Sequence, residues 1–192
     1  MNIPNTLSLI RICLVPLVVL FYLLNLTLLA VIIFIVAACT DFLDGYIARK
    51  YNMVTDLGKL LDPIADKILV LSALFLISYS AVLQPSWIGA VYGTIIISRE
   101  LIISVFRQIA ASKGIIMKAN LYGKIKTFVQ TVALPIVLLL NAQTDITAIS
   151  PVLYNVLYMA GHITLIIAVL LTIMSGVVYL IQNIQVLKQS EV

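Results

Sequence analysis

Long apolar stretches, separated by short polar or turn-forming segments, dominate the chain. Each stretch is about twenty residues long, which is the length a helix needs to cross the hydrocarbon core of a bilayer. The pattern predicts helices near residues 7–24, 28–50, 61–82, 87–109, 119–140 and 152–182. The predicted breaks are Pro4, Asn25, Gln84 to Ser86, Ser112 to Gly114, and Asn141 to Pro151. We therefore expect an all-α, polytopic integral membrane protein with six transmembrane helices.

Composition agrees with this setting. Hydrophobic residues make up 62% of the 192 residues and charged residues only 10%, and the mean hydropathy is +1.15. These values lie far outside the soluble range, and we expect no nucleic-acid partner. The N-terminus lacks the basic region and the cleavage site of a signal peptide, so the first apolar stretch should be retained. We expect a single membrane domain, residues 1–192, without internal repeats.

The basic residues occur in alternate connections. Lys and Arg flank the second and fourth connections and follow the last helix, whereas the first, third and fifth connections contain none. By the positive-inside rule, both termini and the even-numbered connections should be cytoplasmic. The residues that carry this prediction are Arg49, Lys50, Lys59, Lys67, Arg107, Lys113, Lys118, Lys124, Lys126 and Lys188.

Four aspartates interrupt the apolar pattern at a fixed spacing. Asp41 and Asp44 form an i,i+3 pair and Asp62 and Asp66 an i,i+4 pair, so each pair points to one side of a helix. Ionised side chains within spanning helices are costly and are usually functional. Two such pairs facing each other would form an oxygen-rich pocket for hard divalent cations. The nearby Arg49 indicates an anionic ligand, so the pattern predicts phosphoryl chemistry at a membrane.

The helical register places small residues beside the first aspartate pair. Gly45 and Ala48 share one arc of the second helix with Asp41, Asp44 and Arg49, and would let a bulky ligand approach the backbone. Asp44 precedes Arg49 by five residues, about 7–8 Å at ~1.5 Å per residue. The carboxylates should therefore lie in the cytoplasmic half of the bilayer, below the interface.

The second aspartate pair allows two helix starts. If the third helix begins early, Gly58, Asp62 and Asp66 form a matching stripe. The Asp62-Pro63 dipeptide could instead mark the helix start, with Asp62 as the N-cap. In both cases Asp62 and Asp66 stay neighbours.

The run from Asp41 to Asp66 resembles in full the signature of the CDP-alcohol phosphatidyltransferases, D-x2-D-G-x2-A-R-x8-G-x3-D-x3-D. Eight fixed positions at fixed spacing make this signature highly specific. The resemblance implies two divalent cations, Mg²⁺ or Mn²⁺, and a general base at Asp66. The residues that would bind metal are Asp41, Asp44, Asp62 and Asp66. Those that would bind the nucleotide are Gly45, Ala48 and Gly58 at the cytidine and Arg49 at the diphosphate.

A second set of residues resembles one branch of that family, the bacterial phosphatidylglycerophosphate synthases. This set is Asn2 to Leu7, Arg11, Pro16, Ser98 to Glu100, Arg107, and Gly123 to Thr127. The resemblance implies CDP-diacylglycerol and sn-glycerol 3-phosphate as substrates. It also implies a homodimer in the bacterial cytoplasmic membrane, with the active site facing the cytoplasm. It fades after about residue 140.

A phosphorylated acceptor would need its own basic site. Arg99 precedes Arg107 by eight residues, so it should lie at about the depth of the aspartates. Arg107, Lys124 and Lys126 should lie near the mouth and help to hold the acceptor phosphate. Arg99 and Glu100 could instead form a purely structural ion pair.

Two other functions are compatible with intramembrane carboxylates. A divalent-cation carrier or channel would also need them, but no polar series crosses the predicted bundle and Arg49 would repel cations. Another CDP-alcohol transferase would use phosphatidylglycerol, inositol phosphate or serine as the acceptor. The basic residues favour a phosphorylated acceptor over serine.

Several remaining residues are expected to be structural. Cys13 and Cys39 lie in apolar stretches and should be helix-packing residues. His162 should be a packed, hydrogen-bonded histidine rather than a ligand. Gly161 and the Ser175-Gly176 pair should be positions of close helix packing.

Overall fold

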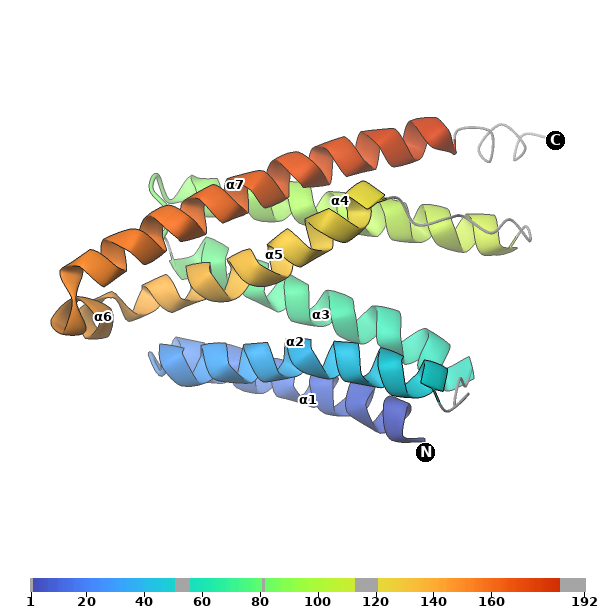
Figure 1. Cartoon of the computed structure of the whole chain (residues 1–192), viewed down its shortest axis with the longest axis horizontal. Helices are drawn as coiled ribbons and strands as arrows, with labels where there is room; N and C mark the ends of the chain where they lie inside the picture. Colours follow the sequence, from blue (N-terminus) through green and yellow to red (C-terminus); the bar gives the residue numbers. More distant parts are fainter. Residues whose placement is uncertain (1, 51–55, 81, 113–120, 184–192) are drawn as a thin grey trace.

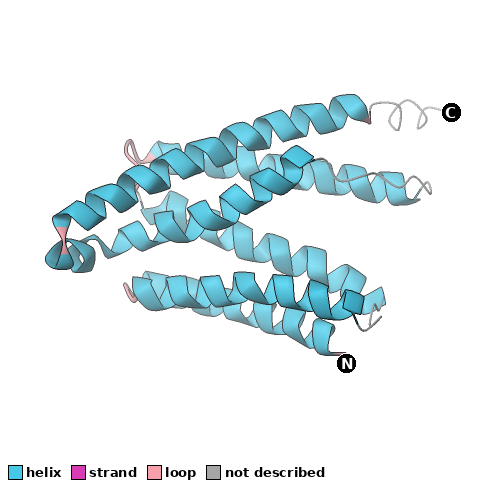
Figure 2. Ribbon diagram, in the orientation of Figure 1, coloured by secondary structure: helices cyan, strands magenta, loops and turns pink. Residues whose placement is uncertain are grey.

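The computed structural model describes residues 2–50, 56–80, 82–112 and 121–183, and every regular element within these ranges is helical. Figure 2 shows the helices joined by short loops. The side chains of residues 41–49, 62 and 66 lie outside the described part, so only their backbone is discussed. The elements are α1 (Ile3–Leu23), α2 (Thr27–Lys50), α3 (Asp56–Ser80), α4 (Trp87–Ser112), α5 (Leu121–Leu139), η1 (Leu140–Ala142), α6 (Gln143–Ile149) and α7 (Pro151–Gln182).

The long helices run alternately in opposite directions (Figure 1). Helices α1, α3 and α5 run one way, and α2, α4 and α7 run the other way. The start of α1, the end of α2, the start of α3 and the end of α7 consequently lie at one end of the bundle, and α6 lies at the other. This arrangement gathers the segments that carry the four aspartates at a single end.

Local sequence sets where the helices begin and end. A proline occupies the first turn of α1, where a missing N–H costs nothing. After α1, Asn25 adopts a left-handed conformation with φ 60°, which asparagine tolerates better than most residues. Helix α7 begins with Pro151, and the Ser150 hydroxyl accepts a hydrogen bond of 3.3 Å from the Leu153 N–H. Three of the expected breaks thus lie at or next to the observed helix ends.

The six predicted helices are confirmed, with two corrections. Helix α3 begins at Asp56 and includes the Asp62-Pro63 dipeptide, so Asp62 as an N-cap is wrong and the early start is correct. A proline removes one backbone hydrogen bond, which neighbouring helices can compensate within a membrane bundle. Residues 140–149 form η1 and α6 instead of an irregular connection.

The described helices are those of a membrane protein. Four of them are long and apolar enough to cross a bilayer: Asn5–Leu23, Trp87–Ala111, Leu121–Ala142 and Pro151–Gln182. Helices α2 and α3 contribute shorter apolar segments, Thr27–Thr40 and Lys67–Ser80. These two segments cover only the part of each helix in which the side chains are described.

Close contacts between helices depend on small residues. A Cβ at Gly89 of α4 would lie 3.1 Å from the Ile77 carbonyl oxygen and 3.2 Å from the Ser78 Cα of α3. A Cβ at Gly161 of α7 would lie 3.2 Å from a Val137 methyl group of α5. Such close approach stabilises membrane helices, because lipid offers no hydrophobic driving force between them. The packing role expected for Gly161 is confirmed.

Two other expectations about single residues have different outcomes. Cys13 and Cys39 are free and exposed, so a role for them in helix packing is wrong. His162 is half-buried, its Nδ1 lies 3.1 Å from the Tyr158 carbonyl oxygen, and its ring centroid lies 4.2 Å from that of Tyr158. A packed, hydrogen-bonded histidine is therefore confirmed.

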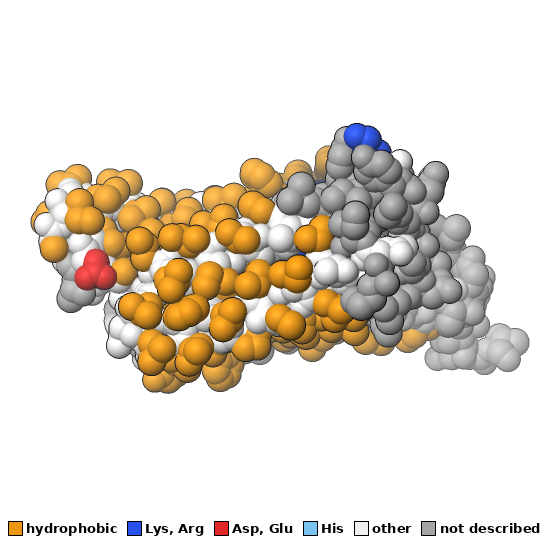
Figure 3. Space-filling model, turned by 90° about the horizontal axis from the view of Figure 1, so that it is seen from below, with side chains coloured by type: hydrophobic (Ala, Val, Ile, Leu, Met, Phe, Trp, Pro, Cys, Tyr) orange, Lys and Arg blue, Asp and Glu red, His pale blue; other side chains and the backbone are white. Residues whose placement is uncertain are grey.

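The described charged side chains that are visible in Figure 3 lie at the two ends of the bundle. Figure 3 shows apolar side chains covering most of the face in view, with Lys and Arg side chains at one end and an acidic side chain at the other. The acidic end is that of α6, which carries Asp145. The basic end, named for its described Lys and Arg side chains, is the one at which α2 ends and α3 begins. It also carries the four aspartates, whose side chains lie outside the described part.

Candidate active site

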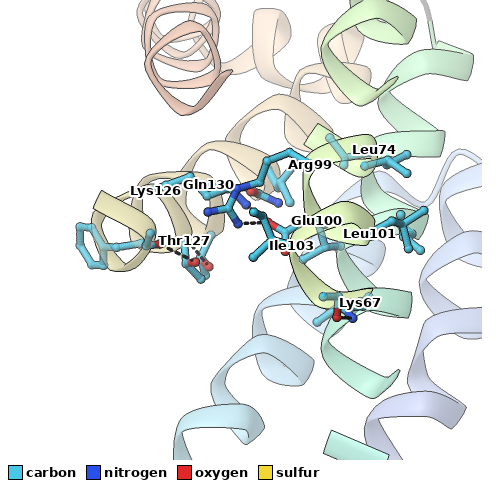
Figure 4. Close-up of a pocket in the computed structure, with 18 of the residues that line it drawn as sticks. Lys67, Leu74, Arg99, Glu100, Leu101, Ile103, Lys126, Thr127 and Gln130 are labelled. Atoms are coloured by element: carbon cyan, nitrogen blue, oxygen red, sulfur yellow. Dashed lines mark hydrogen bonds and ion pairs between the residues drawn. The ribbon is translucent and has the colours of Figure 1, made fainter. Parts of the chain in front are cut away.

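A cavity of about 680 Å³ lies among α1, α2, α3, α4, α5 and α7 (Figure 4). Apolar residues such as Phe34 and Leu74 form much of its wall. Among the described residues, its charged lining is strongly basic: Arg11, Lys67, Arg99, Arg107, Lys124 and Lys126 against the single acid Glu100. A concave site with this excess of positive charge favours an anionic ligand.

Helix register connects this cavity to the aspartates. The wall includes Ala38, which lies three residues before Asp41 on α2, and Val70, which lies four residues after Asp66 on α3. Residues three and four apart share one face of a helix. The helix stripes that carry Asp41 and Asp66 therefore continue into the cavity wall.

The backbone supports the spacing on which the metal prediction depends. Asp41, Asp44, Gly45, Ala48 and Arg49 all lie within α2, and Gly58, Asp62 and Asp66 all lie within α3. Gly58 is buried. Five residues separate α2 from α3, so the two aspartate segments lie at the same end of the bundle. The positions of the four carboxylates fall outside the described side chains, and metal binding stays a prediction.

The centre of the basic lining is a three-residue ionic cluster. Glu100 Oε1 lies 3.4 Å from Arg99 Nη1 and also pairs with Lys126 Nζ, so the carboxylate joins α4 to α5. Lys126 is only 2% exposed, so its predicted place near the mouth is wrong. Arg99 and Lys126 are therefore brought together as expected, and the proposed Arg99–Glu100 ion pair is also present. Two cations share one carboxylate, which leaves a net positive charge for a ligand.

A glycine of α7 makes room for Arg99. A Cβ at Gly176 of α7 would lie 3.1 Å from Arg99 Cγ, which is a tight contact, whereas a Cβ at Gly123 of α5 would lie at an ordinary contact distance of 3.7 Å from Arg99 Nη2. The Nη2 group donates a hydrogen bond of 3.0 Å to the Ser175 hydroxyl. Ser175 and Gly176 thus position a site residue, beyond the packing role expected for them.

Arg107 and Lys124 line the same cavity but are exposed. They lie where α4 ends and α5 begins, which agrees with their predicted place at the mouth. Exposed cations are screened by water and salt, so they should attract a ligand more than they orient it.

Two basic lining residues were not predicted as site residues. Arg11 of α1 is fully buried, and its Nε donates a hydrogen bond of 3.5 Å to the Thr40 hydroxyl. Lys67 of α3, directly after Asp66, donates to the Ser104 hydroxyl. Both are basic residues inside or beside apolar helices. Because charged residues are rare in such segments, their presence was the sequence signal that could have identified them as site residues.

Comparison with known proteins places the chain among lipid-synthesising enzymes. The family model described as CDP-alcohol phosphatidyltransferase matches residues 1–174. Three curated relatives are named CDP-diacylglycerol–glycerol-3-phosphate 3-phosphatidyltransferase. The Bacillus subtilis protein is 36% identical over 98% of both chains. The Rickettsia bellii protein is 36% identical over 93% of both chains. The Escherichia coli K12 protein is 41% identical over 69% of this chain and 74% of its own.

A double-mutant cycle tests the ionic cluster. Glu100→Gln and Lys126→Met should show a coupling of about 1–3 kcal/mol in the free energy of unfolding, because either change alone leaves the other charge poorly compensated. Reversible denaturation in detergent measures this quantity. Glu100→Gln with Lys124→Met is the matched control, and its coupling should be near zero because Lys124 is exposed. Equal couplings in the two cycles would contradict a specific Glu100–Lys126 pair.

Proposed function

The chain belongs to the CDP-alcohol phosphatidyltransferase family, and we propose that it transfers a phosphatidyl group from CDP-diacylglycerol to sn-glycerol 3-phosphate. The products are phosphatidylglycerol phosphate and CMP. The observation that carries this proposal is the basic cavity. Its wall includes residues of α2 and α3 that share a helix face with the motif aspartates. The printed names of the curated relatives support the same pair of substrates.

We propose that the aspartate segments form the donor site. The donor set fits hard divalent cations, since it consists of carboxylate oxygens on two helices at one end of the bundle. Asp41, Asp44, Asp62 and Asp66 would hold two ions, Mg²⁺ or Mn²⁺. Such ions, when bound, supply positive charge that neutralises the diphosphate. Arg49 would bind the diphosphate, and Gly45, Ala48 and Gly58 would leave room for the cytidine.

The ionic cluster would hold the acceptor. Arg99 and Lys126 offer fixed positive charge inside the cavity, and Lys124 and Arg107 add charge near its mouth. A phosphate bound there would hold the glycerol beside the helix stripe that carries Asp66. We assign Asp66 as the general base, which takes the proton from the attacking hydroxyl at a carboxylate oxygen. Fixing the acceptor in this way replaces a bimolecular encounter by a positioned one.

The alternatives fit these residues less well. A cation carrier would have to pass its ion along a cavity whose described charges are mostly positive, and this arrangement repels cations. Serine carries no phosphate and would not use the cluster of Arg99 and Lys126. Inositol phosphate is the second candidate acceptor, because the basic lining favours any phosphorylated alcohol.

We further propose how the protein sits in the membrane. Helices α2 and α3, of 24 and 25 residues, are long enough to cross a bilayer, and they would complete six spans. The alternating helix directions and the basic end of the bundle support cytoplasmic termini and a cytoplasmic active site. The bacterial relatives support the cytoplasmic membrane of a bacterium. Residues 1–192 would form one domain, and the family resemblance supports a homodimer.

An acceptor panel tests the proposed reaction. Purified protein should use sn-glycerol 3-phosphate in preference to inositol phosphate, serine and phosphatidylglycerol, each offered with CDP-diacylglycerol in detergent. Arg99→Ala should raise the KM for glycerol 3-phosphate by about tenfold or more while leaving the KM for CDP-diacylglycerol nearly unchanged, because a charge-assisted contact to phosphate is lost. Preference for another acceptor would overturn the specificity but not the reaction class.

A comparison of carboxylates separates the base from the metal ligands. Asp66→Asn should lower turnover by about 10²–10⁴, while binding of CDP-diacylglycerol in Mg²⁺ stays near normal. Asp41→Asn, or chelation by EDTA, should abolish both turnover and binding. Asp145→Asn, at the opposite end of the bundle, is the control and should change neither. If Asp66→Asn weakens binding as much as Asp41→Asn, Asp66 is chiefly a ligand.

Thiol labelling tests the membrane layout. In a background without Cys13 and Cys39, single cysteines near Lys50 and Lys113 should react only from the cytoplasm. Cysteines near Gln84 and Thr144 should react only from outside, because the predicted spans place these positions on the opposite face. Labelling near Gln84 or Thr144 from the cytoplasm would contradict the six-span layout.

A further inference from the structure

One polar group in the cavity wall has no role in the ionic cluster. Gln130 lies on α5 and is only 3% exposed, and it lines the cavity. Its Oε1 atom is buried and finds no hydrogen-bond donor among the described residues. A buried amide oxygen left unpaired costs about 1–3 kcal/mol. Such a group in a native protein calls for an explanation, and a ligand that donates a hydrogen bond supplies one.

The surroundings of Gln130 show what kind of ligand could pair with it. Lys126 lies one helical turn earlier on α5, and Figure 4 shows Gln130 beside the cluster that Lys126 forms with Arg99 and Glu100. No described residue donates to this oxygen, and the buried Nε of Arg99 in the same cluster also has no hydrogen-bond partner among the described residues. Lys126 donates to Glu100, and Arg99 donates to Glu100 and Ser175. The amide oxygen therefore borders the proposed phosphate site but accepts no hydrogen bond from the described residues that form it.

The chemistry of an amide oxygen suits a hydroxyl group. A neutral acceptor can bind an alcohol O–H without repelling a phosphate beside it, as a carboxylate would. One helical turn, ~5.4 Å, separates Gln130 from Lys126, which is comparable to the reach of a three-carbon chain. A phosphorylated polyol bound at Arg99 and Lys126 could thus place a hydroxyl at Gln130.

We propose that Gln130 is a specificity-determining residue that accepts a hydrogen bond from the acceptor hydroxyl that is not phosphatidylated. For sn-glycerol 3-phosphate this is the hydroxyl at C2. The inference rests on the proposed function and adds the means by which the site selects a polyol phosphate over a simple alkyl phosphate. An acceptor without that hydroxyl leaves the amide buried and unpaired, which is how sites built for a hydroxyl reject analogues that lack it.

The test compares two acceptors that differ by one hydroxyl. The wild-type protein should use sn-glycerol 3-phosphate about 10–100 times more efficiently, as kcat/KM, than 3-hydroxypropyl phosphate, which lacks the C2 hydroxyl. Gln130→Met keeps the size of the side chain and removes the amide. It should lower kcat/KM for glycerol 3-phosphate and bring the ratio near one. Its kcat/KM for 3-hydroxypropyl phosphate should be unchanged or higher.

Stability supplies a readout that does not depend on turnover. Because Gln130→Met removes a buried, unpaired oxygen, it should raise the unfolding temperature of the ligand-free protein. A purely structural role would have the opposite sign. Thr131→Val is the matched control, since Thr131 is the next residue, also lines the cavity, and donates within its own helix to the Thr127 carbonyl oxygen. This control should preserve the acceptor ratio.

The outcomes separate the two levels of the proposal. A wild-type protein that uses neither acceptor overturns the proposed function. A wild-type ratio near one overturns the role of Gln130 alone, as does an unchanged ratio in Gln130→Met. Should Gln130→Met fold poorly, Gln130→Leu carries the same comparison, and a lower unfolding temperature in both variants also overturns the inference.

Discussion

The cost of placing charge inside an apolar bundle constrains this molecule more than any other factor. Every charged side chain within a spanning helix needs a partner, a ligand or access to water. The described basic residues meet this need at the cavity and at one end of the bundle, where Arg107 and Lys124 remain exposed. The apolar remainder of each helix then only has to pack. The same helices thus carry charged residues at the cavity and at one end, and apolar residues that anchor them in the membrane along the rest of their length.

Glu100 illustrates how this constraint produces a binding site. A buried lysine without a counter-charge would lose its proton or destabilise the bundle. Pairing Lys126 and Arg99 with one carboxylate retains both cations in the cavity while leaving them short of full neutralisation. An anionic acceptor can supply the missing negative charge. The Arg99–Glu100 ion pair therefore serves both the stability of the bundle and the proposed binding site.

Small residues have a corresponding role on the neighbouring helices. Gly176 admits the aliphatic part of Arg99 against α7, while Ser175 accepts one of its N–H groups. Helix packing and site geometry are coupled here, because the contact that brings α4 close to α7 also fixes the direction of the guanidinium. Gly89 and Gly161 make comparably close contacts that serve packing alone.

The sequence by itself determined the helices, the aspartate spacing and the family, because apolar length, helical period and a fixed motif are local properties of the chain. It could not determine that the start of α3 extends through Pro63, since neighbouring helices decide whether such a proline is tolerated. Nor could it place Arg11, Lys67 or Gln130 in the cavity wall. Which face of each helix points inward depends on contacts between residues far apart in the chain. Tertiary packing decided which face of each helix points inward, because these side chains contact residues of other helices and those contacts exist only once the helices have packed.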